Sequence, residues 1–227
     1  MLSQSLAQLN HASVQNLAWA IGGPSLIRTM EGMEALDDSF FRAALQERLS
    51  WLKQVDQDPS ELEAFLGDPP TGRLGIYFER LVSFWLRHDP EYELIAENLQ
   101  VREGGHTYGA FDFILRNSAG QVQHWELAIK YYLKRFEGDD WSVWVGPNKI
   151  DRLDKKLQRM RDHQLPLSSG ALGKQALQEV GVTQLPQRPA RQVPPEDVPD
   201  RAQPVRHDRG RRGEERALLP HRLPEHE

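Results

Sequence analysis

Two apolar runs joined by a short turn constrain the fold of this chain more than any other feature. Residues 107–115 and 124–133 are rich in aromatic and aliphatic side chains, and residues 116–121 separate them. The separating segment contains Gly120, which can adopt the positive φ of a tight turn. This pattern predicts a β-hairpin with one strand on each side of the turn.

Three charged residues lie within these apolar runs. Asp112 belongs to the first run, whereas Glu126 and Lys130 belong to the second. Burying such groups costs several kcal/mol unless they are paired or bind a cation. Because residues at even spacing on a strand share a face, Glu126 and Lys130 are predicted to point the same way, with Asp112 facing them across the hairpin. The pattern favours a functional site, and the alternative is that Asp112 and Glu126 are structural.

Composition narrows the chemistry of such a site. The 227 residues are enough for one domain with a sizeable core, and the absence of cysteine excludes thiolate metal sites and cysteine nucleophiles. Oxygen and imidazole remain as ligands, which favours hard metals such as Mg²⁺ or Mn²⁺. The net charge of −5 restricts nucleic-acid binding to a local basic patch. We expect no membrane partner and a cytoplasmic location, since neither a membrane-length apolar run nor a secretion signal is visible.

Residues 1–70 are expected to form a helical N-terminal region, because apolar residues recur there at helical spacing. The strongest helix pattern follows this region and contains Glu79, which has no basic partner one turn away. Glu79 is either a third acid of the site or a solvated carboxylate on the outer face. The predicted helices span residues 11–22, 38–54, 60–65 and 73–88.

Residues 71–167 are expected to form an α/β core. Strands are predicted over 92–101 and 141–145 in addition to the hairpin, and a helix over 149–164. Together they give a mixed central sheet of about four strands flanked by helices. Basic residues concentrate in this half of the chain and are candidate contacts to a nucleic-acid backbone, namely Lys149, Arg152, Lys155 and Lys156.

Residues 168–227 are expected to form a disordered tail. From residue 187 to 227 there are nine arginines and seven prolines but no Phe, Tyr, Trp, Ile or Lys. Such a segment cannot bury enough apolar surface to offset its ordering entropy. It is either a natural arginine-rich arm, which its eight acidic residues argue against, or the out-of-frame translation of a GC-rich gene, which we favour.

The order of a helix with Glu, a strand, a strand with Asp, a strand with Glu and Lys, and a helix resembles the PD-(D/E)XK nuclease superfamily. The chain resembles more closely the bacterial family DUF1853, which has been grouped with those nucleases. The resemblance covers roughly residues 13–167. It rests on Leu17-Ala18-Trp19-Ala20-Ile21, Phe111-Asp112-Phe113-Ile114-Leu115, the segment 125–133, and Gly146-Pro147-Asn148 with Asp151-Arg152-Leu153-Asp154.

This resemblance implies a restriction-endonuclease-like fold and a Mg²⁺-dependent nuclease, with Mn²⁺ as the other candidate ion. Asp112 and Glu126 would hold the ion, Glu79 would assist them, and Lys130 would orient or deprotonate the attacking water. The superfamily has one residue between the acid and the lysine, whereas three separate Glu126 from Lys130. Four strand steps amount to about 13 Å, so a bulge must shorten the gap or Lys130 must contact the phosphate instead. The alternative is a catalytically degenerate module that binds nucleic acid or protein.

Other candidate residues have simpler interpretations. His124 shows no metal-ligand spacing and is predicted to be a strand residue at the surface. Trp141 and Trp144 have the rings needed to stack on bases, but two tryptophans on a strand more often belong to a core.

Overall fold

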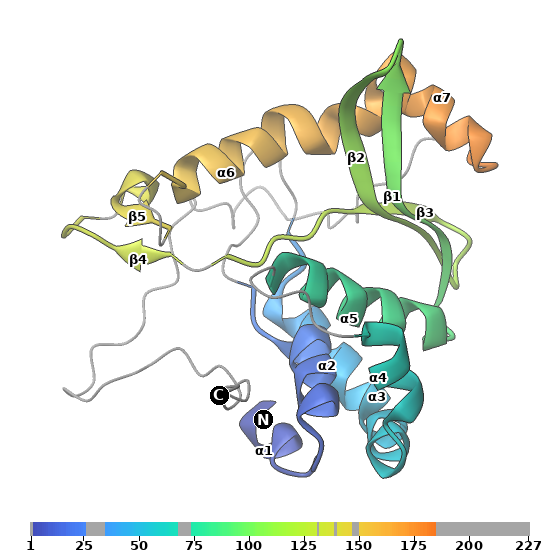
Figure 1. Cartoon of the computed structure of the whole chain (residues 1–227), viewed down its shortest axis with the longest axis vertical. Helices are drawn as coiled ribbons and strands as arrows, with labels where there is room; N and C mark the ends of the chain where they lie inside the picture. Colours follow the sequence, from blue (N-terminus) through green and yellow to red (C-terminus); the bar gives the residue numbers. More distant parts are fainter. Residues whose placement is uncertain are drawn as a thin grey trace, which may run out of the picture.

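The computed structural model of the protein describes residues 2–25, 35–67, 74–130, 132–138, 140–146 and 150–184. Figure 1 shows a bundle of N-terminal helices below a three-stranded sheet, with helices of the C-terminal part beside the upper end of the sheet. The combination of helices and strands expected from the sequence is therefore confirmed.

The N-terminal helices follow the apolar pattern closely. Asp37 caps the third helix, because its Oδ1 accepts hydrogen bonds of 2.9 Å from the backbone N–H groups of Ser39 and Phe40. Within the described ranges, no helix combines the length and apolarity needed to cross a membrane. The helices are α1 (Leu2–Leu6), α2 (Ala12–Gly22), α3 (Asp38–Gln57), α4 (Ser60–Leu66) and α5 (Leu74–His88).

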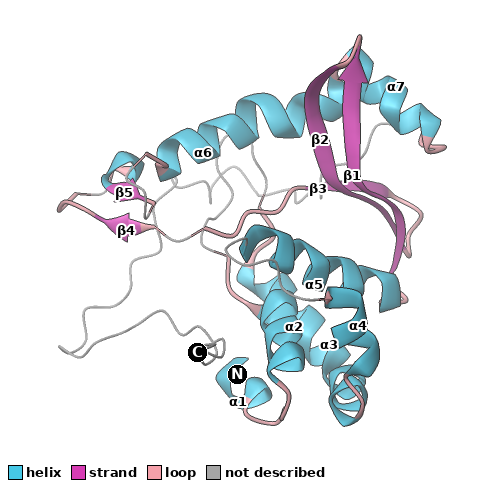
Figure 2. Cartoon of the chain, viewed as in Figure 1, coloured by secondary structure: helices cyan, strands magenta, loops and turns pink. Residues whose placement is uncertain are grey.

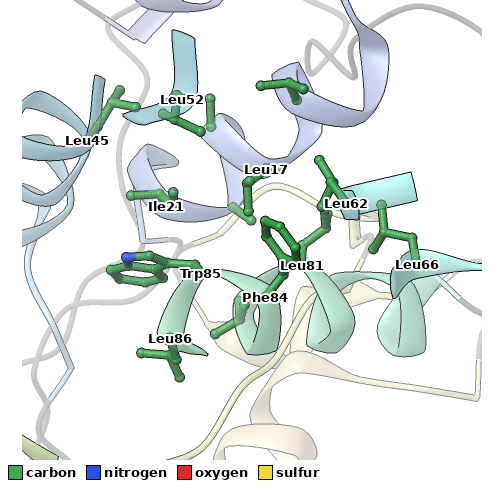
Figure 3. Close-up of a cluster of buried hydrophobic side chains, with 14 of the residues drawn as sticks. Leu17, Ile21, Leu45, Leu52, Leu62, Leu66, Leu81, Phe84, Trp85 and Leu86 are labelled. Atoms are coloured by element: carbon green, nitrogen blue, oxygen red, sulfur yellow. The ribbon is translucent and has the colours of Figure 1, made fainter. Parts of the chain in front are cut away.

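Helix α5 is held in a core formed with α2, α3 and α4 (Figure 3). All residues from 81 to 86 are buried, and the Trp85 side chain is only 2% exposed. The ring of Trp85 also lies 6.1 Å from the ring of Trp125 on the sheet, measured between centroids. The same core therefore fixes α5, which carries Glu79, against the sheet that carries Asp112.

The main sheet contains β1 (Tyr92–Glu103), β2 (His106–Asn117) and β3 (Val122–Trp125), in the order β1-β2-β3 (Figure 2). Both pairings are antiparallel. The prediction of a mixed sheet of about four strands is wrong for the described residues, since the second sheet has two strands and is antiparallel as well. The physical reason is that tight turns join β1, β2 and β3, whereas parallel neighbours need a long crossover.

Strand β3 ends at Trp125, so the prediction that Glu126 and Lys130 share one strand face is wrong. The ladder would continue by pairing residue 126 with Asp112, because Phe113 pairs with Trp125. Instead, Asp112 Oδ2 accepts a 2.8 Å hydrogen bond from the backbone N–H of Leu127. A side chain that takes a backbone donor in this way competes with the ladder, and the chain leaves the sheet.

The next segment forms a small second sheet and a composite helix. The strand predicted over 141–145 is confirmed only at Trp144–Val145, because Trp141–Val143 form a 3₁₀ turn. The helix predicted over 149–164 begins later, and Lys149 lies outside the described residues. The elements are β4 (Leu133–Lys134), η1 (Trp141–Val143), β5 (Trp144–Val145), α6 (Leu153–Arg159), the π-helix η2 (Met160–Gln164) and the 3₁₀-helix η3 (Leu165–Ser169).

Helix α7 (Ala171–Glu179) lies inside the segment expected to be a disordered tail. Its residues Ala176 and Leu177 are buried against Phe111 and Ile114 of β2. The expectation is therefore wrong for residues 168–184, because this part still carries enough apolar side chains to cover the sheet. The rest of the predicted tail, 185–227, lies outside the described residues.

Replacing Gly173 in α7 by alanine is expected to destabilise the protein by about 3 kcal/mol. An added Cβ would lie 1.8 Å from the backbone carbonyl oxygen of Leu167, which cannot move as a side chain can. Gly75 in α5 is the matched control, because its Cβ would meet nothing within 4 Å. Urea unfolding should place Gly75→Ala within about 1 kcal/mol of the wild type. Equal stability of the two variants would contradict the close approach at Gly173.

Candidate active site

Three acidic residues from separate elements lie within electrostatic reach of one another. Glu79 is on α5, Asp112 is on β2, and Glu126 follows the end of β3. Burial and the charge of Glu126 raise the pKa of Asp112 to about 7, and the charge of Glu79 adds to this effect. The hydrogen bond from Leu127 and the charge of Lys156 act in the opposite direction.

Glu79 is the outer member of this group. Its side chain is exposed, as the solvated alternative predicts. Partial desolvation and the charge of Glu126 nevertheless raise the pKa of Glu79, while the charge of Lys156 lowers it. Glu79 is therefore a solvated carboxylate that lies close enough to Glu126 to respond to its charge.

Glu126 is the buried centre of the group, with a side chain that is 1% exposed. Its Oε1 lies 2.7 Å from Nε2 of His124, and its Oε2 accepts a 2.8 Å hydrogen bond from Nε2 of Gln164. Two partners on opposite oxygens hold the carboxylate in one orientation. A carboxylate oxygen has two lone pairs, so each oxygen of Glu126 keeps one beyond these two contacts.

Lys156 is the basic side chain whose charge acts on both Asp112 and Glu79. Its Nζ donates a 3.3 Å hydrogen bond to Oε1 of Gln164, the residue that also donates to Glu126. Gln164 was not a candidate from the sequence, because it is 38 residues away from Glu126 along the chain and follows no recognisable motif.

Lys130 has a different acidic partner. Its Nζ forms a 2.9 Å ion pair with Asp151, and its side chain is 50% exposed. Of the four residues predicted for catalysis, the structure thus groups Glu79, Asp112 and Glu126 electrostatically, and pairs Lys130 with a different acid.

Comparison with known proteins decides the family. A family described as a domain of unknown function, DUF1853, matches residues 15–191, which is more than half of the 227 residues. The chain belongs to the DUF1853 family. The match extends past residue 167 and includes α7, so the resemblance covers more of the chain than the sequence motifs indicated. No curated protein and no solved structure matches the chain.

In this DUF1853 protein, His124 is part of the site, and its predicted place at the surface is wrong. Its side chain is 5% exposed, and its ring packs edge-to-face on Phe111 with 4.8 Å between centroids. The register supplies the reason: His124 pairs with Ile114, which is 0% exposed, so the hairpin pairing buries the histidine. Counting residue pairs outward from the turn at Gly120 places His124 opposite Ile114, so the burial of His124 was predictable from the sequence.

A magnesium ion at these acids would have to keep part of its water shell. No three His, Asp or Glu side chains within the described part of the chain lie close enough to form a metal cage. Mg²⁺ is commonly held by one or two carboxylates together with water and substrate phosphates. Asp112 and Glu126 supply two carboxylates of this type, and their mutual repulsion is the electrostatic condition that a divalent cation relieves.

The four basic residues of this DUF1853 protein that were predicted to contact a nucleic-acid backbone differ in their surroundings. Arg152 forms an ion pair with Asp154, Lys155 is exposed, and Lys156 is half-buried beside the acids. Trp141 packs on the buried Leu157 and Met160 of the same helical segment, in agreement with its prediction as a core residue. The structure does not describe Lys149.

Proposed function

We propose that this protein is a magnesium-dependent nuclease with a restriction-endonuclease-like, PD-(D/E)XK-type core, acting on nucleic acid in the cytoplasm. The observation that supports it is the electrostatic group of Glu79, Asp112 and Glu126, in which burial and repulsion raise the pKa of Asp112 to about 7. Acids whose pKa is raised by burial and by one another's charge are common at functional sites. A bound divalent cation removes the repulsion between them.

Asp112 and Glu126 would hold Mg²⁺, with Mn²⁺ as a substitute, and Glu79 would assist from the exposed side. The bound ion would supply charge neutralisation and a more acidic water. In the reaction, a water oxygen forms a bond to phosphorus while the bond from phosphorus to the leaving oxygen breaks. The leaving oxygen keeps the electron pair and takes up a proton, while the proton of the attacking water passes to solvent. Arg152 and Lys155 would contact the phosphates on either side.

The buried hydrogen bonds fix where the two metal-holding carboxylates point. Leu127 N–H orients Asp112, while His124 and Gln164 orient Glu126. Such supporting contacts commonly change metal affinity about 10-fold to 100-fold when removed.

Isothermal titration calorimetry tests the ion site without a choice of substrate. The wild type is expected to bind Mg²⁺ and Mn²⁺, and Asp112→Asn to bind them at least about tenfold more weakly. Asp162→Asn is the matched control, because Asp162 is an exposed acid paired with the neighbouring Arg161. Equal affinity of wild type and Asp112→Asn would exclude Asp112 as a ligand.

Cleavage assays complete the test of the proposed function. Plasmid and single-stranded DNA and RNA should be cut by the wild type only when Mg²⁺ or Mn²⁺ is present, and cleavage should be lost in Asp112→Asn. Cleavage that survives this substitution would indicate a contaminating enzyme.

A non-catalytic binding module is the second candidate, and one observation favours it. Both oxygens of Glu126 already have hydrogen-bonding partners within the protein, so its burial is offset without an ion. Nucleic-acid binding by the wild type without cleavage at any Mg²⁺ or Mn²⁺ concentration would support the module and overturn the nuclease.

A further inference from the structure

We infer that Lys156, and not Lys130, is the amine that acts on the phosphate in this site, and that Gln164 is the residue that positions it. The inference rests on the proposed function. It replaces Lys130, which the sequence motif places on the hairpin, with Lys156, which lies on the helix α6.

The two lysines differ in what they contact. Lys130 is half-exposed and its Nζ lies 2.9 Å from Asp151. Lys156 is joined to the buried acid by two hydrogen bonds in series, 3.3 Å from Lys156 Nζ to Gln164 Oε1 and 2.8 Å from Gln164 Nε2 to Glu126 Oε2. The second arrangement holds an ammonium group next to the acids without neutralising it in a direct ion pair with Glu126.

The amide of Gln164 is suited to this position. Its oxygen accepts from the lysine while its NH₂ group donates to the carboxylate, so one side chain satisfies a cation and an anion together. A carboxylate at position 164 would repel Glu126, and an amine there would repel Lys156. The alternation of donor and acceptor therefore defines which way the amide points.

The backbone of this segment places the two residues in line. Lys156 and Gln164 are eight positions apart, which is about 2.2 turns of an ordinary α-helix and would leave their side chains offset by roughly 80° around the helix axis. The π-helix η2 covers Met160–Gln164 and takes more residues per turn, which brings Gln164 back over Lys156. Buried Leu157 and Met160 hold the segment in place, since they pack against Trp141, Leu153 and Leu165.

The chemistry follows from the charge of Lys156. Its ammonium group would donate a hydrogen bond to a non-bridging phosphoryl oxygen and stabilise the negative charge that grows there. No bond to the lysine forms or breaks, and it stays protonated throughout. An amine acting on the transition state lowers kcat when removed, whereas a simple backbone contact mainly raises KM.

Steady-state cleavage kinetics with Mg²⁺ test the inference on the full-length protein. Lys156→Met should lower kcat about 100-fold, and Lys156→Arg should recover part of the loss because the positive charge remains. Gln164→Leu should lower kcat about 10-fold. Lys174→Met, an exposed lysine of α7, is the matched control and should behave as the wild type.

Two measurements separate the inference from the proposed function. Calorimetry should show that Lys156→Met still binds Mg²⁺, and thermal unfolding should show that it is folded, so that loss of kcat reports the amine alone. A kcat loss in Lys130→Met as large as that in Lys156→Met, or a Lys156→Met variant with unchanged kcat, would overturn the inference while leaving the nuclease intact. A wild type that neither binds Mg²⁺ nor cleaves would overturn the proposed function and the role of Lys156 with it.

Discussion

Asp112→Asn is expected to make the metal-free protein more stable at neutral pH, although it removes a residue of the proposed site. The folded protein raises the pKa of Asp112 from 3.8 to about 7. Between these values the folded state binds more protons than the unfolded state, so the free energy of unfolding falls as pH rises from about 4 to about 7. At pH 8 the raised pKa therefore lowers the free energy of unfolding by about 4 kcal/mol. Asparagine carries no charge and keeps an oxygen for the N–H of Leu127.

The measurement is urea unfolding at several pH values between 5 and 8 with a chelator present. The wild type should lose stability as pH rises, and Asp112→Asn should exceed it by about 2–4 kcal/mol at pH 8. Added Mg²⁺ should stabilise the wild type more than the variant, because only a bound ligand shifts unfolding in this way. If the stability of the two proteins depended on pH in the same way, the raised pKa of Asp112 would be contradicted.

Asp56 provides a control, because its pKa is shifted in the opposite direction from that of Asp112. Its side chain is 6% exposed and accepts hydrogen bonds from the backbone N–H groups of Asn10 and His11. Burial acts to raise the pKa of Asp56, but these bonds and those from the two side chains together lower it. Its stabilising contribution is therefore present above the ordinary pKa of an aspartate and is lost as pH falls through the lowered value. Asp56→Asn should destabilise the protein at pH 7.

Local patterns in the sequence predicted the parts of the fold that local physics determines. Helix α5 was predicted because apolar residues cover more than one of its faces, and β1 and β2 because their apolar runs flank turns with glycine. The end of β3 was not predictable in this way. It depends on Asp112 taking the N–H of Leu127, a contact between residues that are 15 positions apart.

The charge interaction among the acids could be anticipated from the sequence, but the lysine whose charge acts on them could not. Asp112 and Glu126 stand out because charges are rare in apolar strands, and that signal is local. Motif spacing predicts Lys130 as the partner lysine only if the strand continues beyond Trp125. Once β3 ends at Trp125, spacing along the chain no longer reports proximity, and a π-helix turn brings Lys156 and Gln164 to the acids instead.

Arg48→Met is expected to cost about 3–5 kcal/mol, because it would leave a buried carboxylate without its cation. Asp89 follows the last residue of α5, and its side chain is 2% exposed. Arg48 of α3 contacts both carboxylate oxygens, with 2.8 Å from its Nε to Oδ2 of Asp89. The ion pair therefore ties α3 to the end of the helix that carries Glu79.

A double variant distinguishes the loss of the ion pair from general damage to the core. Asp89 also accepts hydrogen bonds from Nε1 of Trp85 at 2.6 Å and from the backbone N–H of Glu91 at 2.9 Å. An asparagine at position 89 has a single acceptor oxygen but no charge, so Arg48→Met/Asp89→Asn should be more stable than Arg48→Met alone, by about 1–3 kcal/mol. Urea unfolding at pH 7 measures both. A double variant that is less stable than Arg48→Met would mean that the hydrogen bonds of Asp89, and not its charge balance with Arg48, stabilise the junction of α3 and α5.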